Sequence, residues 1–169
     1  MVIINRRIFL PPLASENTMM TMLPIPKMET RFGKLYEADC LSILPHIPSG
    51  TIDLVFADPP FNLGKEYNSK FDDAVPERNY ILWCEKWLDE LVRVLRPGGS
   101  LFLFNLPKWN LPLGAFLGKK LTFRHWISVD IKYSLPIPKR LYPSHYSMLY
   151  FIKGDKPAIL TCCNYAIPC

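Results

Sequence analysis

The chain has 169 residues, of which 49% are hydrophobic, 13% aromatic and 21% charged, a balance that excludes an intrinsically disordered protein and allows one buried core. Its 20 Lys and Arg against 15 Asp and Glu give a net charge of +5 and an isoelectric point near 9.0. That excess suits a polyanionic partner such as nucleic acid, and it fits a mildly basic protein surface equally well. No apolar stretch is long enough to cross a bilayer, so we expect no membrane contact.

The amino-terminal segment, residues 1–29, is predicted to be a poorly structured tail. Pro11 and Pro12 interrupt its apolar run, which argues against a secretory signal peptide. The chain also holds 5 cysteines in no repeating framework, which favours free thiols in a reducing compartment. The C-x-x-C spacing of a zinc site is absent from Cys162, Cys163 and Cys169, and we expect no bound metal.

The first predicted elements are a short strand over residues 34–38 and a short helix over residues 41–47. Residues 52–57, I-D-L-V-F-A, form the strongest predicted strand, because a nearly all-apolar run is typical of a parallel strand buried on both faces. The strand is predicted to end at Asp58-Pro59-Pro60, since successive prolines remove donors from the sheet ladder.

A helix over residues 80–95 is predicted from apolar side chains that recur at helical spacing: Tyr80, Cys84, Trp87, Leu88, Leu91 and Leu95. The run Pro97-Gly98-Gly99 is expected to end this helix, and residues 100–104 to form a second buried strand. Strand, helix and strand in this order make a βαβ unit, which implies a parallel sheet. Residues 107–118 are predicted to be irregular, and residues 123–133 and 146–153 to be strands.

The loop that leaves the first buried strand reads D-P-P-F, and it lies where open parallel sheets bind their ligands. The carboxylate of Asp58 and the backbone carbonyl of Pro59 could accept from the two N–H groups of an exocyclic base amine. Such acceptors stabilise the positive charge that develops on the nitrogen during alkylation. Phe61 offers a flat ring for stacking a base. On the motif alone, a plain strand end with a core phenylalanine is the alternative.

Three blocks of sequence extend this motif. They read E-A-D-C-L-S-I-L-P-H-I-P-S-G-T-I-D-L-V-F-A-D-P-P-F-N-L-G-K-E-Y, then W-L-D-E-L-V-R-V-L-R-P-G-G-S-L-F-L-F, then S-H-Y-S-M-L-Y-F-I-K-G. In this order they resemble the amino-terminal part of the beta-class, circularly permuted DNA amino-methyltransferases of restriction–modification systems, over about residues 33–156. The resemblance implies an α/β, Rossmann-like fold with a mostly parallel sheet, here incomplete, and S-adenosylmethionine as the cofactor.

The resemblance also implies roles for individual residues. The catalytic motif corresponds to Asp58, Pro59, Pro60 and Phe61. The contacts to the adenosyl part of the cofactor correspond to Asp39 and Cys40, although Asp39 is equally suited to cap the helix that follows it. The candidate contacts to the base and to DNA phosphates are Asn62, Lys65, Tyr67, Lys139 and Arg140. For the first three of these, a solvated loop residue is the alternative.

The implied function is methyl transfer from S-adenosylmethionine to an exocyclic amine of double-stranded DNA, with the target base flipped out of the helix. An acid at position 58 favours N6 of adenine, because Asp at this motif position is commoner among adenine enzymes of the resembled family, and N4 of cytosine is the alternative. We expect a cytoplasmic, DNA-associated protein of prokaryotic or phage type, and a homodimer is left open. An RNA or protein amine methyltransferase and an inactive DNA-binding remnant are the rival interpretations.

One feature of the resembled family is missing, a cofactor loop of the type D-P-F-x-G-x-G-T, since none of the 8 glycines forms G-x-G after a strand. We therefore expect residues 30–156 to be the amino-terminal half of a catalytic domain and residues 157–169 to begin a truncated next region. By itself the chain is expected to bind the cofactor weakly and to be inactive, with an unpaired apolar edge on the strand at 52–57.

Overall fold

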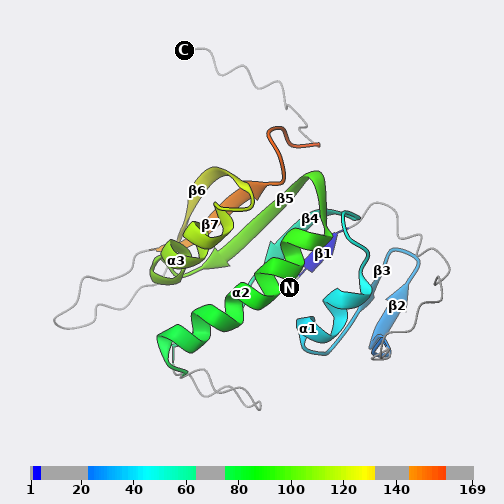
Figure 1. The fold of residues 1–169 in the computed structure, drawn as a ribbon. Coiled ribbons are helices and arrows are strands. Elements are labelled where there is room, and N and C mark those ends of the chain that lie inside the picture. The colour runs from blue at the N-terminus through cyan, green and yellow to red at the C-terminus, as the bar shows by residue number, and fades with distance from the viewer. Residues whose placement is uncertain (1, 5–22, 64–74, 132–144, 159–169) are drawn as a thin grey trace.

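The computed structural model describes residues 2–4, 23–63, 75–131 and 145–158. These residues form a five-stranded sheet in the order β1-β4-β5-β7-β6 and a separate hairpin, β2-β3 (Figure 1). The strands are β1 (Val2–Ile4), β2 (Met28–Thr30), β3 (Gly33–Leu35), β4 (Ile52–Ala57), β5 (Leu95–Asn105), β6 (Thr122–Asp130) and β7 (His145–Ile152). The helices are α1 (Cys40–Ile43), the 3-10 turn η1 (Leu44–His46), α2 (Glu77–Val94) and α3 (Pro107–Leu117).

The predicted βαβ unit is confirmed, because β4 and β5 pair in parallel across the α2 crossover, with Val55 opposite Leu101 and Ala57 opposite Leu103. The other pairings are antiparallel: β1 with β4, β5 with β7, and β6 with β7. The described sheet is therefore mixed, and the expectation of a mostly parallel sheet does not hold for the described residues. The α/β, Rossmann-like class expected from the sequence is confirmed.

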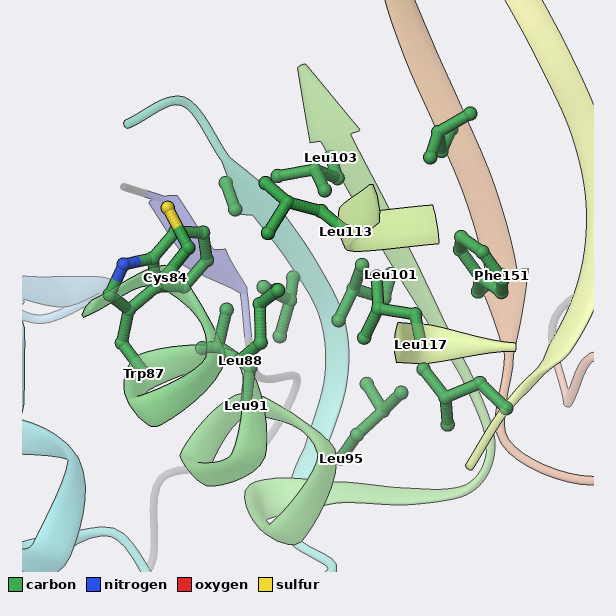
Figure 2. Packing of buried hydrophobic residues seen from close by; sticks show 14 of the residues in the cluster. Cys84, Trp87, Leu88, Leu91, Leu95, Leu101, Leu103, Leu113, Leu117 and Phe151 are labelled. Carbon is green, nitrogen blue, oxygen red and sulfur yellow. The ribbon is translucent and has the colours of Figure 1, made fainter. Parts of the chain in front are cut away.

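Both long helices, α2 and α3, cover the same face of the large sheet (Figure 1). Alternate side chains of each strand point to this face, so that Leu101 and Leu103 of β5 and Phe151 of β7 are fully or almost fully buried. Figure 2 shows how the helices meet them through Cys84, Trp87, Leu88 and Leu91 of α2 and Leu113 and Leu117 of α3. Up to Leu91, the apolar stripe predicted for residues 80–95 is therefore the core-facing side of α2, and Leu95, its last member, is the first residue of β5.

Helix α2 begins at Glu77, earlier than predicted, and ends at Val94, before the Pro97-Gly98-Gly99 run expected to stop it. The Lys153 ammonium, just beyond β7, donates to the carbonyl of Val92 in the last turn of α2 at 2.6 Å and to that of Leu95, the first residue of β5, at 2.7 Å. The run Pro97-Gly98-Gly99 instead lies inside β5, which reaches back to Leu95. The prediction that these residues end the helix is wrong, because tertiary contacts close α2 first.

Residues 107–118, predicted to be irregular, form helix α3 up to Leu117. Pro107 stands in the first turn, where a helix does not need the missing N–H. Trp109, Leu113 and Leu117 are buried against the sheet, and this packing outweighs the low helix propensity of Pro112. A Cβ on Gly114 would lie 2.9 Å from Leu149 Cδ1, so a small residue lets α3 approach β7 closely.

Two expectations about the amino-terminal region are wrong. Residues 2–4, placed in the tail, form β1 and cover the edge of β4 that was expected to be unpaired, with Val2 opposite Phe56. Residues 34–38, expected to be a strand, contribute only as far as Leu35, and that strand pairs with β2 in the small hairpin. Within the described residues, no helix is both long and apolar enough to span a membrane.

Candidate functional site

The D-P-P-F loop leaves β4 at the edge of the sheet where the parallel strands β4 and β5 both end. Because β7 runs antiparallel to β5, its first residues reach the same edge, with Ser147 opposite Asn105. Helix α3 starts only two residues beyond Asn105, and the first turns of α2 are tied to the same loop. Four elements therefore surround the predicted motif, at the edge where open sheets bind ligands.

Asp58, the first residue of the motif, exposes its side chain. Neighbouring atoms nevertheless exclude part of the solvent around the carboxyl group, and this partial burial raises the pKa of Asp58 above its ordinary value. Among the described residues, the Asp58 carboxylate accepts no hydrogen bond from another side chain or from the backbone. An exposed carboxylate without a partner in this part of the chain is available to a ligand.

The other three residues of the motif differ in exposure, and Phe61 packs against neighbouring aromatic rings. Pro59 is buried and Pro60 exposed, and the half-buried ring of Phe61 lies 5.8 Å from the ring of Phe104 and 5.5 Å from that of Tyr146. Phe104 and Tyr146 stand on the sheet face opposite the helices. Phe61 therefore joins an aromatic cluster rather than the main core, and part of its ring stays accessible.

Two side chains from the helices hold the backbone of this loop. The Tyr80 hydroxyl of α2 donates to the Pro60 carbonyl at 2.6 Å, and the Trp109 indole N–H of α3 donates to the Phe61 carbonyl at 2.7 Å. Asn105, at the end of β5, donates its amide to the Tyr80 hydroxyl at 3.0 Å. Sequence reasoning placed Tyr80 in the core stripe only and did not single out Asn105 or Trp109. A polar residue directly after the apolar strand at 100–104 was the available signal for Asn105.

Asn62, a predicted DNA contact, folds back on its own loop. Its side-chain amide donates to the Val75 carbonyl and accepts from the Val75 N–H, both at 2.9 Å. Its backbone adopts a positive φ of 52°, a conformation that Asn tolerates better than most residues. These bonds assign Asn62 a loop-closing role, and its contact to DNA stays a prediction. The other predicted contacts to base and phosphates lie outside the described residues: Lys65, Tyr67, Lys139 and Arg140.

Asp39 caps α1, as one of the two sequence interpretations expected, since its carboxylate accepts from the Leu41 N–H at 2.9 Å. The side chain stays exposed, so the cap leaves it accessible to a ligand. Cys40 packs its half-buried side chain against the core, and burial, followed by the nearby Asp39 carboxylate, raises the pKa of its thiol to about 11. Cofactor contacts by Asp39 and Cys40 stay predictions. No group of three or more His, Cys, Asp or Glu residues that could hold a metal ion occurs in the described part of the chain.

Comparison with solved structures places this architecture in a known class. The fold matches the cytosine-N4-specific PvuII DNA methyltransferase with a TM-score of 0.58 at 19% identity, over 73% of this chain and 50% of that one. It matches M1.HpyAVI, solved in complex with SAM, with a TM-score of 0.51 at 17% identity, over 72% and 55%. The chain therefore has the α/β fold of DNA methyltransferases.

Sequence comparison defines the family. The N6/N4 methyltransferase family, described as DNA methylase, matches residues 52–166. The chain is 53% identical over 132 residues to the type II methyltransferase M.BamHI of Bacillus amyloliquefaciens, covering 78% of this chain and 31% of that protein. The chain belongs to the N6/N4 DNA methylase family, and it spans less than half the length of the first curated relatives it matches.

Proposed function

We propose that this chain supplies the base-amine site of an S-adenosylmethionine-dependent DNA methyltransferase, with N6 of adenine as the favoured target. The observation that carries the proposal is the D-P-P-F loop at the carboxyl edge of β4, with an exposed Asp58 carboxylate. Membership of the N6/N4 DNA methylase family supports it. The same membership disfavours an RNA or protein amine methyltransferase.

The chemistry follows from the state of the target nitrogen. Its lone pair is delocalised into the base ring, so the amine is a weak nucleophile. Two acceptors, the Asp58 carboxylate and the Pro59 carbonyl, would hold its N–H groups and stabilise the positive charge that forms on nitrogen. The half-exposed Phe61 ring would stack against the flipped base. Flipping is required because the amine of a paired base is inaccessible to such a loop.

The residues present fit one end of the cofactor. S-adenosylmethionine, when bound, supplies the electrophilic methyl group. The exposed Asp39 carboxylate could accept hydrogen bonds from the ribose hydroxyls or the adenine amine of an adenosyl group. Cys40 beside it would offer an uncharged thiol, because its pKa is raised to about 11. This sequence has no match to the D-P-F-x-G-x-G-T loop that contacts the methionine end in the family.

DNA contacts beyond the target base are proposed for the loops. Lys65, Lys139 and Arg140 would neutralise phosphates, in keeping with the net charge of +5, and Asn62 and Tyr67 would border the base. The proposed location is the prokaryotic cytoplasm, where the DNA is. A homodimer stays a prediction, which analytical ultracentrifugation of the intact enzyme would test.

The decisive experiment substitutes Asp58 in the intact enzyme. Loss of a preorganised acceptor costs on the order of a hundredfold in rate or more, so Asp58→Ala should abolish methyl transfer while sparing cofactor binding. The matched control is Asp155→Ala, which removes an exposed acid after β7 and should leave the rate unchanged. Transfer by Asp58→Ala at the wild-type rate would refute the role of this carboxylate.

The product identifies the base. We expect N6-methyladenine in nucleosides released from DNA that the intact enzyme has methylated. Mass spectrometry that finds N4-methylcytosine alone would reassign the target and keep the reaction class. Mass spectrometry that finds neither base would favour the inactive remnant.

A further inference from the structure

The motif loop is fixed from the helix side by donors that are almost entirely shielded from solvent. Tyr80 and Trp109 are each 3% exposed, and Asn105 is fully buried. The rings of Tyr80 and Trp109 lie 4.6 Å apart, so the two donors form one packed unit between α2 and α3. Their acceptors are the consecutive carbonyls of Pro60 and Phe61.

The direction of each hydrogen bond in this unit is determined by its chemistry. The backbone N–H of Leu106 donates to Asn105 Oδ1 at 2.7 Å, so the Asn105 amide nitrogen must face the Tyr80 hydroxyl. That hydroxyl then accepts from Asn105, and its own proton is directed to the Pro60 carbonyl. The other orientation of the Asn105 amide would lose the bond from Leu106 and would draw the Tyr80 proton away from the Pro60 carbonyl. A single arrangement of donors therefore holds the loop.

The wider network holds Asn105 itself. The Ser147 hydroxyl of β7 donates to the Asn105 backbone carbonyl at 3.2 Å. Asn110 of α3 donates to that hydroxyl at 2.7 Å and to the Ser147 carbonyl at 3.0 Å. The end of β5, the start of β7 and the start of α3 are thus tied together behind the D-P-P-F loop.

The hydrogen bonds from Tyr80 and Trp109 restrict the loop backbone where its prolines leave it free. A proline ring fixes φ but leaves ψ free, and ψ decides where the carbonyl points. At Pro60 and Phe61 the two hydrogen bonds turn the carbonyls toward the helices. Among the described residues the preceding carbonyl, that of Pro59, has no hydrogen bond. The anchored pair therefore sets the chain direction for two groups that have no hydrogen bond among the described residues, the exposed Asp58 carboxylate and the carbonyl of the buried Pro59.

We propose that Tyr80, Asn105 and Trp109 are positioning residues for methyl transfer: they hold the D-P-P-F backbone so that the acceptors of Asp58 and Pro59 meet the target amine. This inference rests on the proposed function. None of the three residues touches the reacting atoms, and each acts through the Pro60 and Phe61 carbonyls. A misplacement of about 1 Å at a reacting group can cost on the order of a hundredfold in rate.

The first test compares Tyr80→Phe with Tyr150→Phe in the intact enzyme. Tyr80→Phe removes only the hydroxyl that holds Pro60, whereas Tyr150→Phe removes a half-buried hydroxyl whose partner is Ser100, 3.3 Å away on the far sheet face. We expect Tyr80→Phe to lower kcat roughly tenfold to a hundredfold with KM for the cofactor little changed. Tyr150→Phe should stay within about twofold of wild type, since Tyr150 does not contact the loop.

The second test uses the tryptophans. Trp109→Phe removes the donor to Phe61, and Trp87→Phe makes the same change at an equally buried site whose indole N–H has no hydrogen-bond partner among the described residues. Both changes leave a similar cavity, so a purely structural effect would be similar in the two variants. The inference expects a fall in kcat with Trp109→Phe that Trp87→Phe does not show.

Hydrogen–deuterium exchange of the peptide over residues 58–63 gives a readout besides activity. Exchange there should rise in Tyr80→Phe and Trp109→Phe and not in the control variants. Unchanged exchange, a wild-type kcat in Tyr80→Phe, or equal losses in variant and control would each overturn the inference. A wild-type enzyme that methylates no base amine would refute the proposed function and the catalytic purpose of the anchors together, while the exchange data would still report whether the loop is anchored.

Discussion

Gly98 and Gly50 offer a matched pair of substitutions that tests how β5 is joined to the end of β7. Both glycines have a positive φ, 75° at Gly98 and 69° at Gly50. They differ in their surroundings. A Cβ on Gly98 would lie 2.7 Å from Ala158 Cβ and 2.8 Å from the Ala158 nitrogen, whereas a Cβ on Gly50 would meet nothing within 4 Å.

The neighbour at Gly98 cannot easily withdraw. The Ala158 N–H donates to the Gly98 carbonyl at 2.8 Å, and the Gly98 N–H donates to the Lys153 carbonyl at 2.6 Å. Relief of the clash in Gly98→Ala would therefore break backbone hydrogen bonds. Left-handed backbone at a residue with a side chain costs about 1–2 kcal/mol, and overpacking adds about 1–3 kcal/mol.

We therefore expect Gly98→Ala to lower the free energy of unfolding by roughly 2–4 kcal/mol, after allowing for the smaller backbone entropy of alanine in the unfolded chain. Gly50→Ala has only the cost of left-handed backbone and no steric clash, so it should lower the free energy of unfolding by about 1 kcal/mol or less. Urea denaturation of the intact enzyme, with unchanged m-values, measures both. If the two variants lost the same stability, the close approach of Ala158 to β5 would be refuted.

Two further predictions concern ionisation. Partial burial raises the pKa of Asp58, and only the ionised carboxylate carries the negative charge that stabilises a positive target nitrogen. The value of kcat should therefore fall as the pH drops through a value above about 3.9, the ordinary pKa of Asp. A pH–rate profile in which kcat does not fall on the acid side above about pH 3.9 would contradict this prediction. Burial raises the thiol pKa of Cys40 to about 11 and that of Cys84 to about 12, so at pH 8 about 0.1% of Cys40, or less of Cys84, is thiolate. Both should resist iodoacetamide in the folded enzyme and react after unfolding, as mass spectrometry of the alkylated peptides would show.

The elements predicted correctly are those whose signal is local. The apolar stripe from Tyr80 to Leu91 and the apolar run at 52–57 are local patterns, and they form helix α2 and strand β4 as predicted. Strand β4 was expected to be buried on both faces, and its second face is only partly buried. Helix α3 was missed because its prolines and glycine lower its propensity, and because the burial that compensates is tertiary. The pairing of β1 with β4 joins residues about 50 positions apart, which no local pattern encodes.

In the candidate site, too, the features with a local sequence signal were predicted, and those that depend on tertiary contacts were not. The position of D-P-P-F after β4 followed from the strand pattern, and the cap formed by Asp39 followed from its place before α1. The partners of the loop did not follow, since Tyr80 and Trp109 lie 20 and 48 residues from the carbonyls they bind. In a sequence, an aromatic residue that packs and one that packs and also donates look alike.

The anchors also couple the shape of the loop to the stability of the core. If the D-P-P-F loop swung outward, the Tyr80 hydroxyl and the Trp109 indole N–H would be left without the carbonyls they bind, in a site where each residue is 3% exposed. An unsatisfied buried donor costs about 1–3 kcal/mol, so the Trp109 indole N–H alone opposes such a movement by about that amount. A variant that removes one of these side chains also loses stability because a cavity forms in the core.

Asn105→Ala leaves the Leu106 N–H and the Tyr80 hydroxyl without the partner they share. It should therefore both destabilise the intact enzyme and loosen the loop. Urea denaturation and exchange over residues 58–63 would measure the two effects in one variant, and a loosened loop with unchanged stability would show that the anchors and the core are independent.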